Sequence, residues 1–443
     1  MPDRDGENGH ANPDPQHPEL SPLVPGRGQR PSFSLEALRE RIETQFNEET
    51  ANRADILLEL DTENKRRDAL REVMDYVLAV EAVTLSPVAK QTLLERAYRN
   101  LFSFGPLDRY LRDEAITEIA INGPAQIHVR RGMDKPMPTG AAFDDHVHLA
   151  SVLQRVLATS GVILSESEPF LETGVVINGR AARISLIGPP VNPDYNLEIR
   201  LHPTEPITFE DLHTRFRAVP PQVTELLQAI LQAEHGLLIV GEVGLGKTTL
   251  ASALAHFLPV DATIFAVERA AELHLPAYIT RRAAIPPTPS SDGTSFQQQF
   301  QAALEQMPDW LIVDEIRGDE AAAAWSALER EETPRYVWLF RGSSVPKRLH
   351  SALSMVVRKH QQSIDQTVIN HALARHLPFV AAFKTINGQP RLHLVAEWVL
   401  GEPDAEGYTS LTLRPLISEQ PGGWLVTENQ PTRPLPLPDD FWE

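Results

Sequence analysis

The stretch 236–250, Gly-Leu-Leu-Ile-Val-Gly-Glu-Val-Gly-Leu-Gly-Lys-Thr-Thr-Leu, contains residue types that can bind phosphate groups. Its spacing of Gly241, four residues, and then Gly246-Lys247-Thr248 fits the phosphate-loop pattern. Glycines allow positive φ and a close approach of backbone N–H groups to one anion, and the start of the following helix adds to that attraction. We therefore expect the phosphate-binding residues to be Gly241, Glu242, Val243, Gly244, Leu245, Gly246, Lys247, Thr248 and Thr249.

Two side chains of this loop would act on a nucleoside triphosphate directly. Lys247 would reach its β- and γ-phosphates and take part in catalysis, and the Thr248 hydroxyl would bind Mg²⁺. The alternative is a glycine turn that happens to carry a lysine. Since an apolar strand over 237–240 precedes the loop and a helix over 247–257 follows it, the context favours phosphate binding.

Two acidic residues follow a second hydrophobic strand, Trp310-Leu-Ile-Val. Carboxylates at a strand end beside a phosphate loop can hold Mg²⁺ and orient water, as phosphoryl transfer requires. We predict these roles for Asp314 and Glu315, with Glu315 also catalytic. The alternative is an exposed strand end with ordinary acids.

The elements that must position these residues alternate between strand and helix from Val223 onward, which predicts an α/β domain with a parallel sheet over 222–400. Before it, proline content predicts a disordered tail, apolar spacings of three and four predict a helical module, and alternation with Asn-Gly turns predicts an α+β domain and then a linker. The tail covers 1–33, the helical module 34–112, the α+β domain 113–203 and the linker 204–221. A C-terminal hairpin with a proline-rich tail is expected over 401–443.

Composition narrows the class of protein. The 443 residues carry 41 Lys and Arg against 60 Asp and Glu, a formal charge of −19, which disfavours direct nucleic-acid binding unless a local basic patch exists. Without cysteine there is no disulfide or thiolate metal site. No apolar run has the length of a transmembrane segment and no signal peptide is recognisable, so a cytoplasmic location is expected.

Several separate motifs occur in an order that resembles the secretion and pilus-assembly ATPases, most of all the CpaF-like motors of Tad/Flp pili, relatives of the type II and type IV secretion ATPases. They are Gly-Pro-Leu at 105–107, Ile-Thr-Glu-Ile with Asn-Gly-Pro at 116–124, Ile-Arg at 199–200, and the phosphate loop. The resemblance implies an N-terminal domain similar to PAS folds, a RecA-like ATPase domain, ATP and Mg²⁺ as cofactors, and a homo-hexameric ring. It also implies inner-membrane platform proteins as partners, with the chain peripheral at that membrane.

The resemblance assigns further site residues. The segment 267–273 resembles the family's Glu-Asp-x-x-Glu-Leu box, so Glu268 would polarise the attacking water; Arg269 stands in place of the aspartate and reverses the charge there. Arg183 and Arg200 match arginines that reach the γ-phosphate in the family. The alternatives are surface acids for the box and loose surface ion pairs for the two arginines.

The expected histidine motifs are missing. On the simplest alignment Glu332 and Phe340 replace the two histidines, and Phe340 cannot hydrogen-bond a phosphate or relay a proton. Two hypotheses follow: an ATP-hydrolysing motor subunit whose activity is weakened by this loss, or a degenerate relative that binds ATP and serves as a structural or regulatory subunit. A nucleic-acid translocase on the same core conflicts with the charge of −19.

Overall fold

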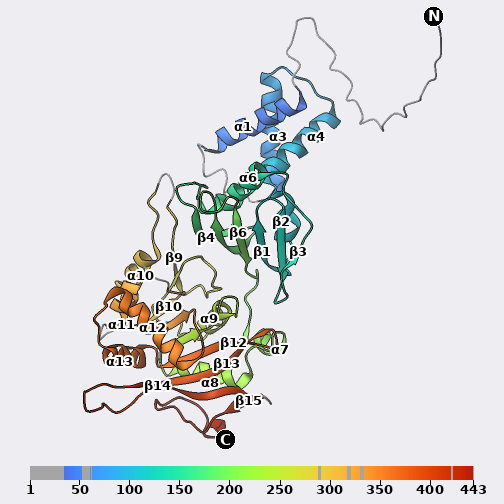
Figure 1. Cartoon of the computed structure of the whole chain (residues 1–443). Coiled ribbons are helices and arrows are strands. Elements are labelled where there is room, and N and C mark those ends of the chain that lie inside the picture. Colours follow the sequence, from blue (N-terminus) through green and yellow to red (C-terminus); the bar gives the residue numbers. More distant parts are fainter. Residues whose placement is uncertain are drawn as a thin grey trace, which may run out of the picture. The chain divides into compact units, whose positions relative to one another are not determined.

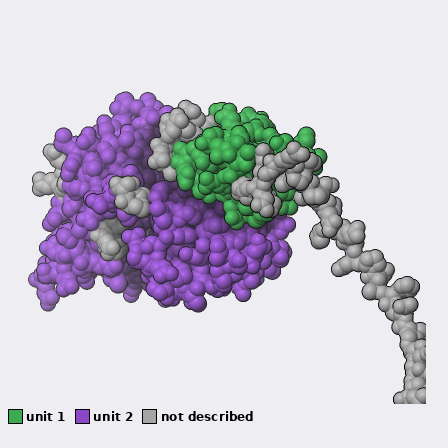
Figure 2. Space-filling view, turned by 90° about the horizontal axis from the view of Figure 1, so that it is seen from above, with its two compact units in different colours: residues 1–103 green, residues 104–443 purple. Residues whose placement is uncertain are grey.

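The computed structural model describes residues 34–51, 60, 62–287, 291–316, 321–329, 334–420 and 423–442. The chain divides into two compact units, Met1–Ser103 and Phe104–Glu443, which Figure 2 shows in different colours. The predicted disordered tail 1–33 lies outside the described residues, as does part of the segment 286–294, which the sequence predicts to be a mobile loop.

The described residues of the first unit contain three helices with a shared apolar core: α1 (Leu35–Ala51), α3 (Glu63–Val80) and α4 (Pro87–Phe102) (Figure 1). Their buried residues recur at spacings of three and four, as in Leu70, Val73 and Val77, which is the period of one helix face. Helix α4 begins after Ser86, whose side chain accepts a hydrogen bond from Ala89 N, and Pro87 occupies its first turn, a combination typical of a helix start.

The second unit begins with a six-stranded antiparallel sheet in the order β3-β2-β1-β6-β5-β4. Its strands are β1 (Ile116–Asn122), β2 (Gln126–Arg131), β3 (Met137–Pro138), β4 (Phe170–Ile177), β5 (Arg180–Ile187) and β6 (Asn196–Leu201), and helix α6 (His146–Leu157) shares their core. Asn178 and Gly179, with φ of 52° and 78°, form the predicted tight turn between β4 and β5.

The short elements η1 (Gly105–Leu107) and α5 (Asp108–Leu111) also pack into this core. Leu107 and Leu111 are fully buried there. The sequence predicts a helical module over 34–112, whereas in the structure residues 104–111 belong to the second unit and share the core of the six-stranded sheet. The apolar spacing alone does not distinguish the two, because it says which residues are buried and not which core buries them.

The rest of the second unit is built on a nine-stranded sheet in the order β15-β14-β13-β12-β7-β11-β10-β8-β9. Its strands are β7 (Leu237–Val240), β8 (Ile264–Glu268), β9 (Thr280–Ala283), β10 (Trp310–Val313), β11 (Arg335–Phe340), β12 (Phe379–Ile386), β13 (Gln389–Leu400), β14 (Leu411–Gln420) and β15 (Gly423–Val426). Strands β9, β8, β10, β11, β7 and β12 run parallel, and the rest are added antiparallel. This confirms the predicted α/β class, and β14 pairs antiparallel with β15 within the segment 401–443, for which the sequence predicts a hairpin and a proline-rich tail.

Helices cover both faces of this sheet, so its central strands are buried on both sides. One face packs against α10 (Phe296–Leu304), α11 (Ala321–Glu329), α12 (Pro346–His360) and α13 (Gln366–His376), and the other against α8 (Pro221–Gln232) and α9 (Lys247–Ala255). Within β7, Leu238 and Val240 face the first group, and Leu237 and Ile239 face the second.

Helix α7 (Phe209–Thr214) and strand β9 are absent from the sequence prediction. Helix α7 lies within the predicted linker and is too short for apolar periodicity to reveal it. Its signal is the capping box in which Thr208 and Asp211 exchange hydrogen bonds. In the described part of the chain, no helix is long and apolar enough to cross a membrane.

The segment after β15 is fastened to the sheet by one buried carboxylate. Glu397 on β13 has no exposed surface and accepts hydrogen bonds from Thr432 N and from Arg433 Nη1, both at 2.7 Å. Burial alone would raise the pKa of Glu397, but the hydrogen bonds from Thr432 and Arg433 outweigh it and hold the pKa below its ordinary value.

Glu397→Ala is expected to lower the free energy of unfolding by about 3 kcal/mol at neutral pH, because Arg433 loses its partner. Since the folded-state pKa is depressed, this stabilisation is present above the unfolded-state pKa and is lost as the pH falls through the folded one. Urea unfolding should therefore separate variant and wild type less at acid pH. The exposed Glu402→Ala serves as a control; equal midpoints for all three proteins would contradict the prediction.

Candidate functional site

The loop 241–246 joins the end of β7 to the start of α9, and two of its glycines have backbone angles that other residues rarely adopt. Gly244 has φ of 80° and Gly246, at the N-cap of α9, has φ of 92°. Gly241 is packed closely, since a Cβ there would lie 3.0 Å from Phe383 Cβ. The loop is thus a backbone cradle at a helix N-terminus, the geometry that binds anions.

Lys247 is buried and turned back over the loop. Its Nζ donates hydrogen bonds to the Gly241 carbonyl at 2.8 Å and the Glu242 carbonyl at 3.1 Å, and lies 3.9 Å from Glu315 Oε2. Burial lowers the pKa of Lys247, and the carboxylates of Glu315 and Asp314 oppose that effect. The ammonium group therefore occupies the space between the loop and the two acids.

Asp314 and Glu315 follow β10, and both are buried, with 8% and 7% of their surface exposed. They lie near Lys247 because β10, β11 and β7 are adjacent parallel strands whose carboxyl ends meet at one edge of the sheet. Thr248, in the first turn of α9, is partly exposed at the same edge. Hydroxyl and carboxylate oxygens are the donors that Mg²⁺ prefers, so this set fits that metal ion.

Glu268, at the end of β8, is almost fully buried, and its oxygens already have partners. Oε2 accepts from Glu272 N and Leu273 N, each at 2.8 Å, and Oε1 accepts from Arg281 Nε at 2.8 Å. Burial raises the pKa of Glu268 to about 7. These contacts position the backbone after β8, and the predicted role of Glu268 as the base stays a prediction.

Arg269 lies beside the two acids of β10. Its backbone N–H approaches Asp314 Oδ2 at 3.4 Å, and its Nε approaches the Glu315 carbonyl at the same distance. The guanidinium stacks on Phe296 at 5.1 Å from the ring centroid. The charge reversal noted in the sequence thus introduces a cation next to Asp314 and Glu315.

Segment 268–274, called here the junction loop, is where the six-stranded sheet meets the nine-stranded one. A Cβ on Gly174 of β4 would lie 2.8 Å from Ala270 Cβ, so only glycine allows this approach. Arg183 of β5 pairs with Glu172 and places its Nη1 3.4 Å from Glu272 Oε1. The structure therefore brings Arg183 to the junction loop.

Arg183 and its charged neighbours change one another's pKa values. Burial opposes the charge of Arg183, but the carboxylates of Glu272 and Glu172 outweigh it and raise its pKa. Burial raises the pKa of Glu272 to about 7 despite this arginine. His202, whose Nε2 is 3.6 Å from Glu272 Oε2, has its pKa lowered to about 4, first by burial and then by neighbouring cations.

Arg200 has a different environment from Arg183, although the two are cross-strand neighbours on β6 and β5. Its guanidinium pairs with Glu198 of its own strand and is about one third exposed. This contact matches the surface-pair alternative, and the predicted phosphate-binding role of Arg200 stays a prediction.

Phe340, which the resemblance aligns with a family histidine, ends β11 as a buried core residue. Its carbonyl accepts a hydrogen bond from Gly241 N at 3.3 Å, so its backbone supports the loop while its ring contributes only packing. Glu332, the other replacement, lies outside the described residues.

The sequence analysis missed two features of this region. Ser252 Oγ donates to the Thr248 carbonyl at 2.9 Å and accepts from His274 N at 3.1 Å, which ties α9 to the junction loop. Arg341, directly after Phe340, lies 3.7 Å from Glu242 through its Nε. The sequence alone could have indicated Arg341, because it directly follows a predicted strand of the sheet that carries the predicted phosphate loop.

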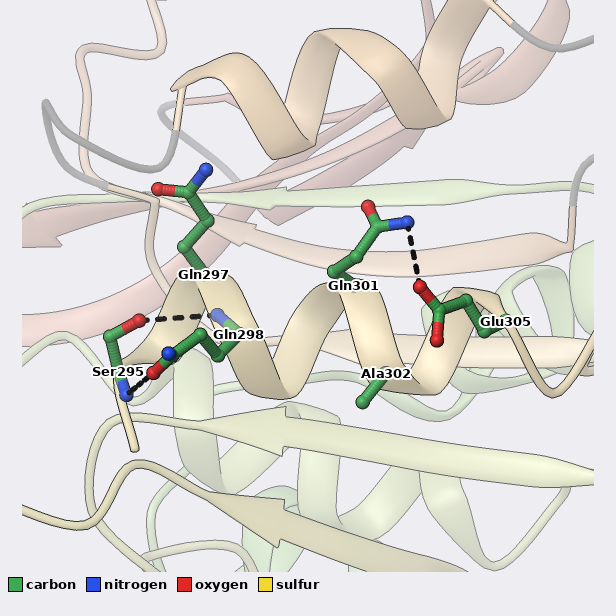
Figure 3. Close-up of a pocket in the computed structure, with 6 residues that line it drawn as sticks. All are labelled: Ser295, Gln297, Gln298, Gln301, Ala302 and Glu305. Carbon is green, nitrogen blue, oxygen red and sulfur yellow. Dashed lines mark hydrogen bonds between the residues drawn. The ribbon is translucent and has the colours of Figure 1, made fainter. Parts of the chain in front are cut away.

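An open surface depression along α10 offers little to a ligand (Figure 3). Half of its lining residues are glutamines, and two of these already make hydrogen bonds, Gln298 with Ser295 and Gln301 with Glu305. No predicted site residue lines it, and we assign no function to it. The lining residues are Ser295, Gln297, Gln298, Gln301, Ala302 and Glu305.

A parallel sheet covered on both faces, with a glycine loop between its central strand and a helix, defines an α/β protein of the phosphate-loop class. Residues 100–330, more than half of the chain, match the family described as type II/IV secretion system protein. The chain belongs to this family.

Curated relatives share modest identity with the chain. An uncharacterized protein of Methanocaldococcus jannaschii is 26% identical over 57% of this chain and 46% of its own length, and a putative conjugal transfer protein of Mycobacterium tuberculosis is 28% identical over 51% and 65%. The type IV secretion system protein VirB11 of Brucella suis is 24% identical over 53% and 71%. The chain thus spans less than two thirds of the first two relatives.

Similar solved structures include the VirB11 ATPase of the Brucella suis type IV secretion system, at 20% identity over 66% of this chain and 95% of that one, with a TM-score of 0.34. The Legionella pneumophila ATPase DotB is 14% identical over 67% and 80%, with a TM-score of 0.45. Since both TM-scores are below 0.5, the family assignment rests on the sequence match.

The raised pKa of Glu272 predicts a pH-dependent stability. Glu272 takes up a proton near pH 7 in the folded state and nearer pH 4.5 in the unfolded state, so its protonation stabilises the fold. This stabilisation is complete below the unfolded-state pKa and is lost as the pH rises through the folded-state pKa. Glu272→Gln, which keeps a neutral side chain, should flatten this fall in urea unfolding midpoints between about pH 5 and 7.

His202 lies beside Glu272, and its lowered pKa gives stability the opposite dependence on pH. The quantity to measure is therefore the difference in unfolding midpoint between wild type and variant at each pH, and not the pH dependence of the wild type alone. Parallel pH profiles for the two proteins would show that Glu272 does not titrate in this range.

Proposed function

We propose that this chain binds ATP with Mg²⁺ and hydrolyses it as the RecA-like motor subunit of a pilus or secretion machine, at a site whose predicted residues are those of the phosphate loop, Asp314 and Glu315. One observation carries the proposal: the buried Lys247 ammonium lies on the phosphate loop and 3.9 Å from Glu315. An ammonium group, a backbone cradle and two buried acids at one edge of a parallel sheet are the parts that phosphoryl transfer uses.

Each group has a separate task in this proposal. Loop N–H groups and Lys247 bind and orient the phosphates, while the buried site excludes bulk water. Thr248 and Asp314 would hold Mg²⁺, which supplies charge neutralisation when bound. Glu315 orients the attacking water, and Glu268, held by Arg281 and backbone N–H groups, keeps the junction loop in place.

The junction loop supports a motor over a simple binder. It is tied to α9 through Ser252 and to the six-stranded sheet through Arg183 and Gly174. A change of charge at the phosphates would therefore be transmitted to the six-stranded sheet through a short chain of contacts in the junction loop. We extend the proposal to a homo-hexameric ring that acts on inner-membrane platform proteins in a Tad/Flp-type, type II or type IV system, supported by family membership.

The alternative is a subunit that binds ATP without turning it over. It is favoured by Phe340, which leaves only packing where a histidine is expected, and by Arg269, which places a cation beside the acids. It shares the binding site and differs only in hydrolysis.

Lys247→Ala is expected to abolish ATP binding, because the cradle loses the group that neutralises the β- and γ-phosphates. Calorimetric titration of the full chain with ATP and Mg²⁺ measures this. Ser252→Ala, which removes a hydroxyl of α9 outside the loop, tests whether any change to this helix has the same effect. Micromolar affinity retained by the Lys247 variant would contradict the proposal.

Glu315→Gln separates the two hypotheses. For a motor we expect phosphate release to fall at least about 100-fold while ATP affinity changes little, since a carboxylate that orients water acts in the transition state. Steady-state phosphate release by the purified protein is the measurement. No turnover by the wild type would favour the ATP-binding subunit, and turnover unchanged by the substitution would place hydrolysis at another site.

A further inference from the structure

The acids and the phosphate loop are separated by one strand, β11, and the residue that follows it is an arginine. In the parallel register Val313 of β10 lies beside Trp338, and Phe340 lies beside Val240. Arg341 therefore leaves the sheet level with Gly241, between the strand that ends in the loop and the strand that ends in Asp314 and Glu315.

The surroundings of Arg341 are those of the phosphate loop. Its Nε lies 3.7 Å from the Glu242 carboxylate in the loop, and about half of its side chain is exposed. Lys247 contacts the same loop residue, because its Nζ donates a hydrogen bond to the Glu242 carbonyl at 3.1 Å. Two cations thus face the same corner, and a shared anion would relieve their repulsion.

We propose that Arg341 is a phosphate-contacting residue that recognises the terminal phosphate of ATP, leaving Glu242 when the nucleotide binds. This rests on the proposed function and adds a residue that determines specificity for ATP over ADP. The planar guanidinium can bind two phosphate oxygens at once, a task that the neighbouring Phe340 cannot perform.

Glu242 acts as the competing partner in the absence of nucleotide. The pair is largely exposed, with 56% and 64% of the two side chains accessible, so it contributes little to folding stability. A triphosphate carries more charge than one carboxylate and offers bidentate geometry, so exchange of partners favours the nucleotide. The same strand supplies a matched control, because Arg335 at its other end pairs with Glu234 away from the loop.

The test is calorimetric titration of the full chain with Mg²⁺ and either ADP or a non-hydrolysable ATP analogue. Arg341→Ala should weaken binding of the analogue about 10- to 100-fold, the loss of one charge-assisted contact, and change ADP affinity less than about 3-fold. Arg341→Lys should restore only part of the loss. Glu242→Gln should strengthen binding of the analogue, and Arg335→Ala should change neither ligand.

The outcomes separate this inference from the proposed function. Unchanged affinity for the analogue in Arg341→Ala would overturn the inference while leaving nucleotide binding intact. Equal losses for ADP and the analogue would also overturn it, since they would indicate a distorted loop. Wild type that binds neither ligand, with Lys247→Ala indistinguishable from it, would remove the proposed function itself.

Discussion

The Lys247 ammonium lies between backbone carbonyls and a buried carboxylate, and the arrangement around it is a balance of opposite charges in a region with little water. Asp314, Glu315 and Glu268 are nearly inaccessible, and Arg269 lies against two of them. Charges cost several kcal/mol to bury unless partners satisfy them. The parallel sheet meets this cost, because the neighbouring strands β7, β11, β10 and β8 end at one edge and bring the charged residues at their ends together.

The junction loop connects that balance to the rest of the second unit. Glu268 accepts hydrogen bonds from the backbone of this loop, and Glu272 forms an ion pair with Arg183 of the six-stranded sheet. Ala270 packs against Gly174 of the same sheet. Two of these carboxylates have pKa values of about 7, so their charge is sensitive to any group that enters the site. A phosphate near Arg183 would compete with Glu272 for it, which gives a physical route from ligand charge to the packing of one sheet on the other.

Departures from the family's motifs read differently once the side chains are placed. Phe340 completes the hydrophobic core and its carbonyl holds Gly241 N, so this position supports the loop without any polar side chain. Positively charged side chains near the loop and the acids come instead from Arg269 and Arg341. Two guanidinium groups, which stay charged at physiological pH, therefore lie close to the loop and the acids.

By itself the sequence determined the glycine-rich loop 241–246, the strand ends at Asp314 and Glu315, and the alternation that makes a parallel sheet, since these depend on backbone geometry within a few residues. Only the tertiary structure decided that Glu268 already has three donors, that Arg183 meets Glu272 while Arg200 turns to Glu198, and that Arg341 faces Glu242. Those contacts depend on strand register and on the approach of two sheets, which local spacing does not encode.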